Sequence, residues 1–260
     1  MQERHLNKQQ YFEEQARTTK KFVIPYLSGL IQITPGTEVL EIGCAEAGNL
    51  KPFLDLGCKC TGIDISCGRI ELAKKFYENH PKRDNLTLVC EDIYNVDPKE
   101  KKYDFIFMRD VIEHIPNQEK FMKFAKEFLK NDGKFFLAFP PWQNPFGGHQ
   151  QITHSKLLSK LPYFHLLPNA VYKFILKSFG EKDKRIEELL EIKATGISIE
   201  RFERILKLEN YIINKRTFFL INPNYETKFN LKPRRQMRLI NAIPGLRNFL
   251  TTAMYYVVSK

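Results

Sequence analysis

The stretch VLEIGCAEAGNL, residues 39–50, decides the fold of this chain. Its first residues form an apolar run typical of a buried strand, and its last residues lead into a helix pattern. The turn between them, from Gly43 to Gly48, has mostly small side chains, and such strand-to-helix turns usually let a ligand approach the backbone. Ala45 and Ala47 stand where these turns often carry glycine, and alanine suits the turn only where φ stays negative. The stretch indicates a nucleotide-type cofactor site and leaves the cofactor open.

Strand and helix patterns alternate from this stretch onward, which predicts βαβ units and a mainly parallel sheet in an α/β fold. The expected strands cover residues 37–43, 58–66, 85–93, 103–110 and 134–141. The expected helices cover residues 49–57, 68–80 and 117–133, the last with Gly133 at its C-terminal cap.

The flanking regions complete one expected domain, residues 1–260. An N-terminal helical segment (1–36) precedes the core (37–141), and a cap insertion with short helical stretches follows (142–196). The remainder, 197–260, reads as a helix with Ser198 at its N-cap and two strands, separated by an insertion at 222–248.

Composition limits the classes of partner. Lys and Arg number 41 against 30 Asp and Glu, which gives a net charge of +11. A basic surface attracts nucleic acid, anionic lipid or an anionic small molecule, although a solvated lysine-rich surface explains the charge equally well. The N-terminal residues lack the apolar region of a signal peptide, and no apolar run approaches the ~20 residues that span a bilayer. The five cysteines form no metal-binding pattern, so we expect reduced thiols in a cytoplasmic protein.

Two acidic residues follow the next strands. Asp64 ends the second strand, 21 residues after Gly43, where a carboxylate can accept hydrogen bonds from ribose hydroxyls. Asp92 ends the third strand, and a carboxylate there can accept a hydrogen bond from an adenine amino group. Because ligands of open α/β sheets bind beyond the carboxyl ends of the strands, we expect both beside the turn after the first strand.

This set of motifs resembles the class I S-adenosylmethionine-dependent methyltransferases. VLEIGCAEAG is similar to their first motif, GIDIS to the acidic end of their second strand, EDI to their adenine-binding turn, and FIFMRDVIEHIPN to the stretch after their fourth strand. The resemblance implies a Rossmann-like sheet of seven strands, mostly parallel with an antiparallel last strand, helices on both faces and helical cap insertions. It also implies S-adenosyl-L-methionine as methyl donor. An NAD-binding protein is less favoured, because the second glycine of GxGxxG is missing.

The resemblance assigns the cofactor site, with Glu41 near the amino-acid end of the cofactor, Asp64 at the ribose and Asp92 at the adenine. The residues expected to bind the cofactor are Glu41, Gly43, Cys44, Ala45, Gly48, Asp64, Ile65, Asp92, Ile93 and Arg109.

The acceptor side is read from the segment after the fifth strand. His149 is the expected general base, since a histidine pKa near neutrality suits deprotonation of a hydroxyl, although a loop histidine bonded to backbone would look the same. Phe139 precedes Pro140-Pro141, so the amino-methylating (Asn/Asp)-Pro-Pro-aromatic signature is absent. Asp110, Glu113 and His114 have the spacing of one helical face and resemble a stretch that binds a divalent metal in some ubiquinone-type O-methyltransferases. We nevertheless assign no metal ligand.

The sequence therefore predicts a methyltransferase that acts on an oxygen of a small-molecule, lipid or glycan acceptor. The basic run KPRRQMR and the apolar residues after it could contact an anionic membrane. Two rivals stay open at this point. One is an RNA methyltransferase, supported by the charge but without an RNA-binding module. The other is a non-catalytic binding module, for which Ala45 and Ala47 are the best argument.

Overall fold

The computed structural model describes residues 7–260, so the part of the expected N-terminal segment before Asn7 lies outside the described residues. One sheet of eight strands runs in the order β3-β2-β1-β4-β5-β8-β6-β7. The strands are β1 (Glu38–Ile42), β2 (Lys59–Asp64), β3 (Leu86–Cys90), β4 (Tyr103–Arg109), β5 (Leu129–Phe139), β6 (Ile212–Ile221), β7 (Arg234–Arg235) and β8 (Ala253–Ser259).

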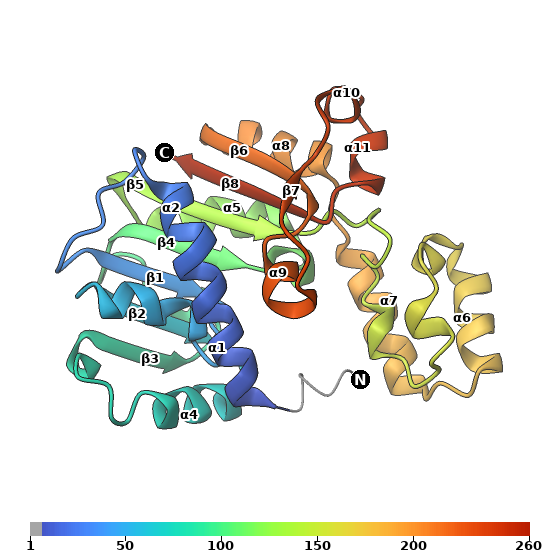
Figure 1. Cartoon of the computed structure of the whole chain (residues 1–260), viewed down its shortest axis with the longest axis horizontal. Helices are drawn as coiled ribbons and strands as arrows, with labels where there is room; N and C mark the ends of the chain where they lie inside the picture. The colour runs from blue at the N-terminus through green and yellow to red at the C-terminus, as the bar shows by residue number, and fades with distance from the viewer. Residues whose placement is uncertain (1–6) are drawn as a thin grey trace.

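Strands β1 to β5 are parallel, whereas β8 pairs antiparallel with both β5 and β6. In Figure 1 the arrows of β3, β4 and β5 point to the same side, and β8 points the opposite way. This confirms the Rossmann-like α/β fold with an antiparallel last strand. The insertion adds the two-residue strand β7 on the outer edge of β6, which makes eight strands instead of the seven expected.

Helices cover both faces of the sheet. The α-helices are α1 (Lys8–Thr18), α2 (Ile24–Leu27), α3 (Lys51–Asp55), α4 (Cys67–Phe76), α5 (Gln118–Ala125), α6 (Asn169–Ser178), α7 (Asp183–Thr195), α8 (Ile199–Leu208), α9 (Asn224–Phe229), α10 (Arg238–Asn241) and α11 (Leu246–Phe249). A π-helical turn, η2 (Thr19–Val23), joins α1 to α2. Short 3-10 turns include η3 (Gly48–Leu50), η5 (Ile93–Asn95), η6 (Ile112–His114), η7 (Lys126–Phe128), η8 (Gln150–Ile152), η9 (Leu158–Lys160) and η10 (Phe164–Leu166).

The alternation of side chains along β5 explains the two cores. Phe135 and Leu137 face one side, where they pack with α5 and α8, while Phe136 and Ala138 face the other side, toward α1, α3 and α4. Both faces of the central strands are apolar, as a covered parallel sheet requires. A third, smaller core lies within the cap insertion, where Tyr172 and Leu176 of α6 pack against Leu189 of α7.

The helix expected over residues 117–133 is too long. Helix α5 and the turn η7 end at Phe128, and β5 begins at Leu129, which pairs with Tyr103. The next pair is Phe105 with Lys134, so the additional residues of β5 form a bulge that contains Gly133. Gly133 therefore does not cap the helix. A Cβ atom there would lie 3.0 Å from the Tyr103 carbonyl oxygen, which accounts for glycine at this position.

The cap and the C-terminal insertion lie beyond the carboxyl ends of the parallel strands. Helices α6 and α7 stand at one end of the molecule, while α10 and α11 project beside the beginning of β8 (Figure 1). Helix α9 from the insertion packs against α1. Within the described residues, no helix is long and apolar enough to cross a membrane.

Candidate active site

The turn after β1 is tied to the end of β2 by three backbone amides. The amides of Gly43 and Cys44 donate to the Ile63 carbonyl oxygen at 2.8 and 3.1 Å, and the Ala45 amide donates to Asp64 Oδ2 at 2.8 Å. The other carboxylate oxygen of Asp64, Oδ1, accepts a hydrogen bond of 2.8 Å from the Ser66 amide. Asp64 thereby holds the turn and the start of α4 in place.

The expectation of negative φ at the two alanines is wrong. Ala45 has a φ of 51° and Ala47 a φ of 58°, so the turn keeps a left-handed geometry that glycine normally provides. The anchoring by Ile63 and Asp64 offers a physical reason, because a turn fixed by several hydrogen bonds can hold a residue in a sparsely populated conformation.

Two glycines of the turn make room for neighbouring elements. A Cβ atom on Gly43 would lie 2.6 Å from Val111 Cγ2, and one on Gly48 would lie 2.5 Å from the Phe12 carbonyl oxygen. Gly48 thus permits the close approach of α1 to the turn. This packing role was not recognised from the sequence, where Gly48 is assigned to the cofactor.

Helix α1 covers the turn. Lys8 Nζ lies 3.0 Å from Oε1 of Glu46, whose side chain is fully buried in the turn. Burial raises the pKa of Tyr11, one helical turn further, to about 12, and the charges of Arg109 and Asp110 act on the same hydroxyl. Tyr11 and Glu46 are therefore parts of the site that the sequence motifs did not reveal.

Two buried ionisable groups, Glu41 and Arg109, lie near the ends of β1 and β4. Glu41 Oε1 accepts a hydrogen bond of 2.7 Å from Asn49 Nδ2, while Glu41 Oε2 and Arg109 Nη1 are buried without a hydrogen-bond partner among the described residues. Burial raises the pKa of Glu41 to about 8, although Asn49 and Arg109 act to lower it. Burial of a polar atom without a hydrogen-bond partner costs free energy. A polar ligand that pairs with Glu41 Oε2 and Arg109 Nη1 would remove this cost.

The ends of β2 and β3 form the opposite side of the site. Asp92 Oδ1 accepts a hydrogen bond of 3.0 Å from the Tyr94 amide, and the Glu91 amide donates to the Asp64 carbonyl oxygen at 3.1 Å. Ile65 exposes 76% of its surface beside Asp64, whereas Ile93 is buried. A solvent-facing isoleucine next to two carboxylates provides an apolar platform edged by hydrogen-bond acceptors.

The structure joins Cys67 to Cys90 by a disulfide, so the expectation that all five cysteines are reduced thiols is wrong for these two. The parallel pairing of β2 with β3 brings Cys90 beside the first turn of α4 across 23 residues of sequence. Cys44, Cys58 and Cys60 are free and buried, as small core residues.

The segment DVIEHI does not form a helical face. Asp110 has a φ of 55°, and only Ile112–His114 form a short 3-10 turn. Glu113 and His114 instead meet His149 of the cap, with possible ligand atoms of all three within 4.8 Å of one another. The rings of His114 and His149 make an edge-to-face contact with centroids 4.8 Å apart. Both carboxylate oxygens of Glu113 are buried without a hydrogen-bond partner among the described residues.

This cluster changes the interpretation of His149. Burial, together with the neighbouring His114 and His165, lowers the pKa of His149 to about 3. A general base works best with a pKa near the working pH, so this value argues against His149 as the base. His149 stands in the left-handed region, at a φ of 52°, and its imidazole is neutral at pH 7, which is the form that binds metals.

The comparisons with known proteins agree with this geometry. A family model described as a methyltransferase domain matches residues 10–165, more than half of the chain. The chain belongs to this family of S-adenosylmethionine-dependent methyltransferases. Its membership confirms the resemblance seen in the sequence, the enzyme class and the methyl donor, S-adenosyl-L-methionine.

Curated relatives are distant and longer than the aligned part. Sterol 4-C-methyltransferase strm-1 of Caenorhabditis elegans is 24% identical over 157 residues, which cover 60% of this chain and 47% of the relative. Ubiquinone biosynthesis O-methyltransferase of Coxiella burnetii (strain RSA 493 / Nine Mile phase I) is 29% identical over 108 residues, or 41% of this chain and 45% of the relative. The aligned region thus spans about half the length of these relatives.

Solved structures share the fold at low sequence identity. Geranyl diphosphate C-methyltransferase from Streptomyces coelicolor A3(2) superposes with a TM-score of 0.59 at 10% identity, covering 94% of this chain and 78% of that one. Magnesium protoporphyrin IX methyltransferase from Synechocystis PCC 6803, with bound S-adenosylhomocysteine, gives a TM-score of 0.55 at 15% identity, covering 95% and 83%.

Proposed function

We propose that this protein transfers the methyl group of S-adenosylmethionine to an oxygen of a small-molecule, lipid or glycan acceptor. The observation that carries the proposal is the pair of buried, unpartnered atoms Glu41 Oε2 and Arg109 Nη1 at the carboxyl ends of β1 and β4. The amino-acid end of the methyl donor has an ammonium and a carboxylate. Glu41 would bind the first and Arg109 the second, which would satisfy both buried groups.

The adenosine end would lie along β2 and β3. Asp64, which already accepts two backbone amides, has the acceptor capacity to bind ribose hydroxyls as well. Asp92 would accept from the adenine amino group, with the exposed Ile65 and the buried Ile93 on either side of the ring. The backbone of Gly43, Cys44 and Ala45 would pass beneath the donor, and Gly48 would keep α1 in contact with that turn.

The acceptor would enter between the strand ends and the two insertions. The sulfonium supplies a good leaving group, so the residues of the chain act mainly by positioning and by excluding water. Asp110, at the end of β4, is half-exposed and close enough to influence the pKa of Tyr11, Tyr225 and Tyr255. It can accept the hydroxyl proton of an acceptor, and we propose it as an alternative base to His149.

The proposed class of acceptor is inferred from the names of the relatives and from a motif that the sequence lacks. Relatives named for O-methylation in ubiquinone biosynthesis and for C-methylation of sterols favour a partly apolar molecule. The missing amino-methylase signature favours oxygen over nitrogen. A lipid acceptor would reach the site from an anionic membrane, so the proposal includes peripheral membrane contact. A cytoplasmic location remains part of the proposal.

A divalent metal is a second element of the proposal, favoured by the cluster of Glu113, His114 and His149. The donor set fits, because a buried carboxylate without hydrogen bonds and two imidazoles from separate segments point to one position. Two nitrogens and one oxygen suit a transition metal such as zinc or manganese better than magnesium. Such an ion would supply a positive charge that favours the deprotonated form of an acceptor hydroxyl.

The test combines binding and turnover. Calorimetry should show binding of S-adenosylhomocysteine and no binding of NAD. Labelled S-adenosylmethionine should then label a component of a lipid or small-molecule extract and leave purified RNA unlabelled. Label in RNA alone would favour the RNA methyltransferase, and cofactor binding without any labelled product from several extracts would favour a non-catalytic module.

A further inference from the structure

The C-terminal insertion exposes large apolar side chains at one tip of the molecule. Residues 237–249, which contain α10 and α11, are called the tip here. Met237, Leu239, Ile243 and Leu246 expose 56%, 82%, 49% and 44% of their surfaces. Single exposed apolar residues are common, but four within ten residues of a short, projecting segment form a patch that favours a binding surface. Figure 1 shows this segment standing out from the end of the sheet.

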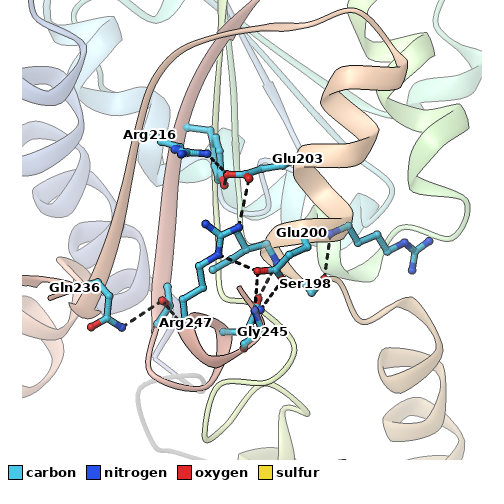
Figure 2. A network of polar contacts seen from close by, with 12 residues as sticks. Ser198, Glu200, Glu203, Arg216, Gln236, Gly245 and Arg247 are labelled. Atoms are coloured by element: carbon cyan, nitrogen blue, oxygen red, sulfur yellow. Dashed lines mark hydrogen bonds and ion pairs between the residues drawn. The ribbon is translucent and has the colours of Figure 1, made fainter. Parts of the chain in front are cut away.

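The tip is held on the body by partly buried polar contacts, which Figure 2 shows. Arg247 Nε lies 2.8 Å from Glu200 Oε1, and Arg247 Nη2 lies 3.4 Å from Glu203 Oε2. Asn248 Nδ2 donates to Glu200 Oε2 at 2.6 Å, and the Gly245 amide donates to Glu200 Oε1 at 3.0 Å. We call Glu200, Arg247 and Asn248 the clamp. The clamp fixes the backbone of α11, which carries Leu246 and lies shortly after Ile243 in the chain.

A cluster of positive charges adjoins the apolar side chains. Four basic residues here are exposed, and none forms an ion pair with another residue from Asn7 to Lys260: Lys232, Arg234, Arg235 and Arg238. The nearby acids are engaged elsewhere: Glu200 and Glu203 contact Arg247, Glu203 also contacts Arg216, and Glu226 contacts Lys21. The positive charge of this basic cluster, which lies beside the tip, is therefore not compensated locally.

The tip adjoins the cap that covers the proposed acceptor site. The Tyr163 hydroxyl of the cap donates to the Phe249 carbonyl oxygen at 3.2 Å, and the two rings lie 6.1 Å apart. A surface that contacts the tip would therefore also lie close to the cap. An acceptor molecule held in that surface would therefore lie near the entrance to the proposed acceptor site.

We propose that the tip and the basic cluster beside it dock on an anionic lipid bilayer, with Leu239, Ile243 and Leu246 entering the interface and the basic side chains on the lipid headgroups. Basic residues alone would suit RNA as well, but large exposed aliphatic side chains beside them suit the boundary between headgroups and acyl chains. This inference rests on the proposed function, because docking would give the enzyme access to a lipid acceptor. The docking itself does not require catalysis.

Vesicle co-sedimentation tests the docking. The full chain should bind vesicles of phosphatidylcholine with phosphatidylglycerol and bind pure phosphatidylcholine vesicles poorly. Ile243→Asp and Leu239→Asp should each weaken binding about tenfold or more, because each places a charge in the interface. Arg234→Gln with Arg235→Gln should weaken it similarly and reduce its dependence on salt. Leu208→Asp, a change at an equally exposed leucine on α8, is the matched control and should leave binding unchanged.

Binding of S-adenosylhomocysteine by each variant separates the possible failures. Variants that keep cofactor affinity but lose vesicle binding support the docking surface. Loss of methyl transfer by a chain that still binds anionic vesicles would count against the proposed function alone. No vesicle binding at moderate salt, or equal vesicle binding by Ile243→Asp, would overturn the inference. RNA retention in a gel shift that depends on the same arginines, without vesicle binding, would also overturn it in favour of RNA.

Discussion

The carboxylate of Asp64, at the end of β2, accepts a hydrogen bond of 2.8 Å from the amide of Ala45 in the turn after β1. One side chain therefore both shapes the cofactor turn and stands where the ribose is expected. Substitution of Asp64 should act on binding through both routes, whereas substitution of a residue that only contacts the ligand would leave the turn intact.

The first prediction concerns this residue. Asp64→Ala should weaken S-adenosylhomocysteine binding by about 1–3 kcal/mol, because a charged acceptor for ribose is lost and the turn loses its anchor. Calorimetry on the purified protein measures this. Asp84→Ala, at an exposed position before β3, is the matched control and should bind as the unaltered chain does. Unchanged affinity in the Asp64 variant would remove the ribose role.

The second prediction links cofactor binding to protons. Because the pKa of Glu41 is about 8 in the ligand-free protein, the carboxyl is largely protonated at pH 7. An ammonium bound there would favour the carboxylate, so binding should release a proton and affinity should rise as pH approaches 8. Calorimetry in buffers of different ionisation enthalpy measures the release. Glu41→Gln should abolish it, and release that persists in this variant would contradict the assignment.

The same group affects stability with a defined sign. Its folded pKa is raised above the unfolded value of about 4.3, so its contribution to stability is fully present below pH ~4 and is lost as pH rises through about 8. The ligand-free protein should therefore unfold more easily at pH 9 than Glu41→Gln does under the same conditions.

The third prediction concerns backbone strain. Ala45→Gly should raise the free energy of unfolding by about 0.5–1 kcal/mol, since relief of a positive φ outweighs the greater freedom of glycine in the unfolded chain. Denaturant unfolding checks the value. Ala73→Gly, in the regular helix α4, is the control and should lower stability, because glycine is unfavourable there. A loss of stability in both variants would show that the strain at Ala45 is small.

The fourth prediction concerns the metal. Equilibrium dialysis should load the protein with zinc or manganese, and the bound ion should raise its melting temperature. Glu113→Gln and His149→Ala should each lower metal affinity by tenfold or more, as loss of a ligand is costly. His154→Ala, in the same cap segment but outside the cluster, should retain the metal. Equal metal content in all three variants would exclude this cluster as the site.

The sequence predicted the parallel core well because local patterns decide it. The strands near Val39, Thr61 and Ile106 are short apolar runs, and each helix between them has its own start and stop residues. The acids at strand ends were found for the same reason, since strand order alone brings Asp64 and Asp92 to one edge of the sheet.

Features that depend on long-range contacts were missed. His149 lies beside Glu113 only because the cap folds back over the turn after β4. No local sequence pattern indicates that the cap folds in this way. Lys130 and its neighbours look helical in sequence but form a bulge, since pairing of Leu129 with Tyr103 outweighs helix propensity. The positive φ at Asp110 was also missed, although aspartate enters the left-handed region more readily than most residues.

The fifth prediction concerns the clamp that holds the tip. Burial opposes ionisation of Glu200, but hydrogen bonds from Asn248, Gly245 and Arg247 outweigh this and lower its pKa to about 2. A lowered acid pKa means that the stabilisation is present above the unfolded pKa of about 4.3 and is lost as pH falls toward 2. Glu200→Gln should therefore lower the free energy of unfolding at pH 7 by roughly 1–2 kcal/mol, less than a fully buried pair would, because the group is partly exposed.

The difference in free energy of unfolding between Glu200→Gln and the unaltered chain should shrink as pH falls from 5 to 2. The reason is that Glu200 then becomes protonated in both the folded and the unfolded state. Denaturant unfolding over this pH range measures it, and limited proteolysis at residues 237–249 reports whether the tip detaches. Glu187→Gln, at an exposed position on α7, is the matched control and should show neither effect. A difference that stays constant down to pH 2 would mean that Glu200 acts through packing alone, and the clamp would then not depend on the charge of Glu200.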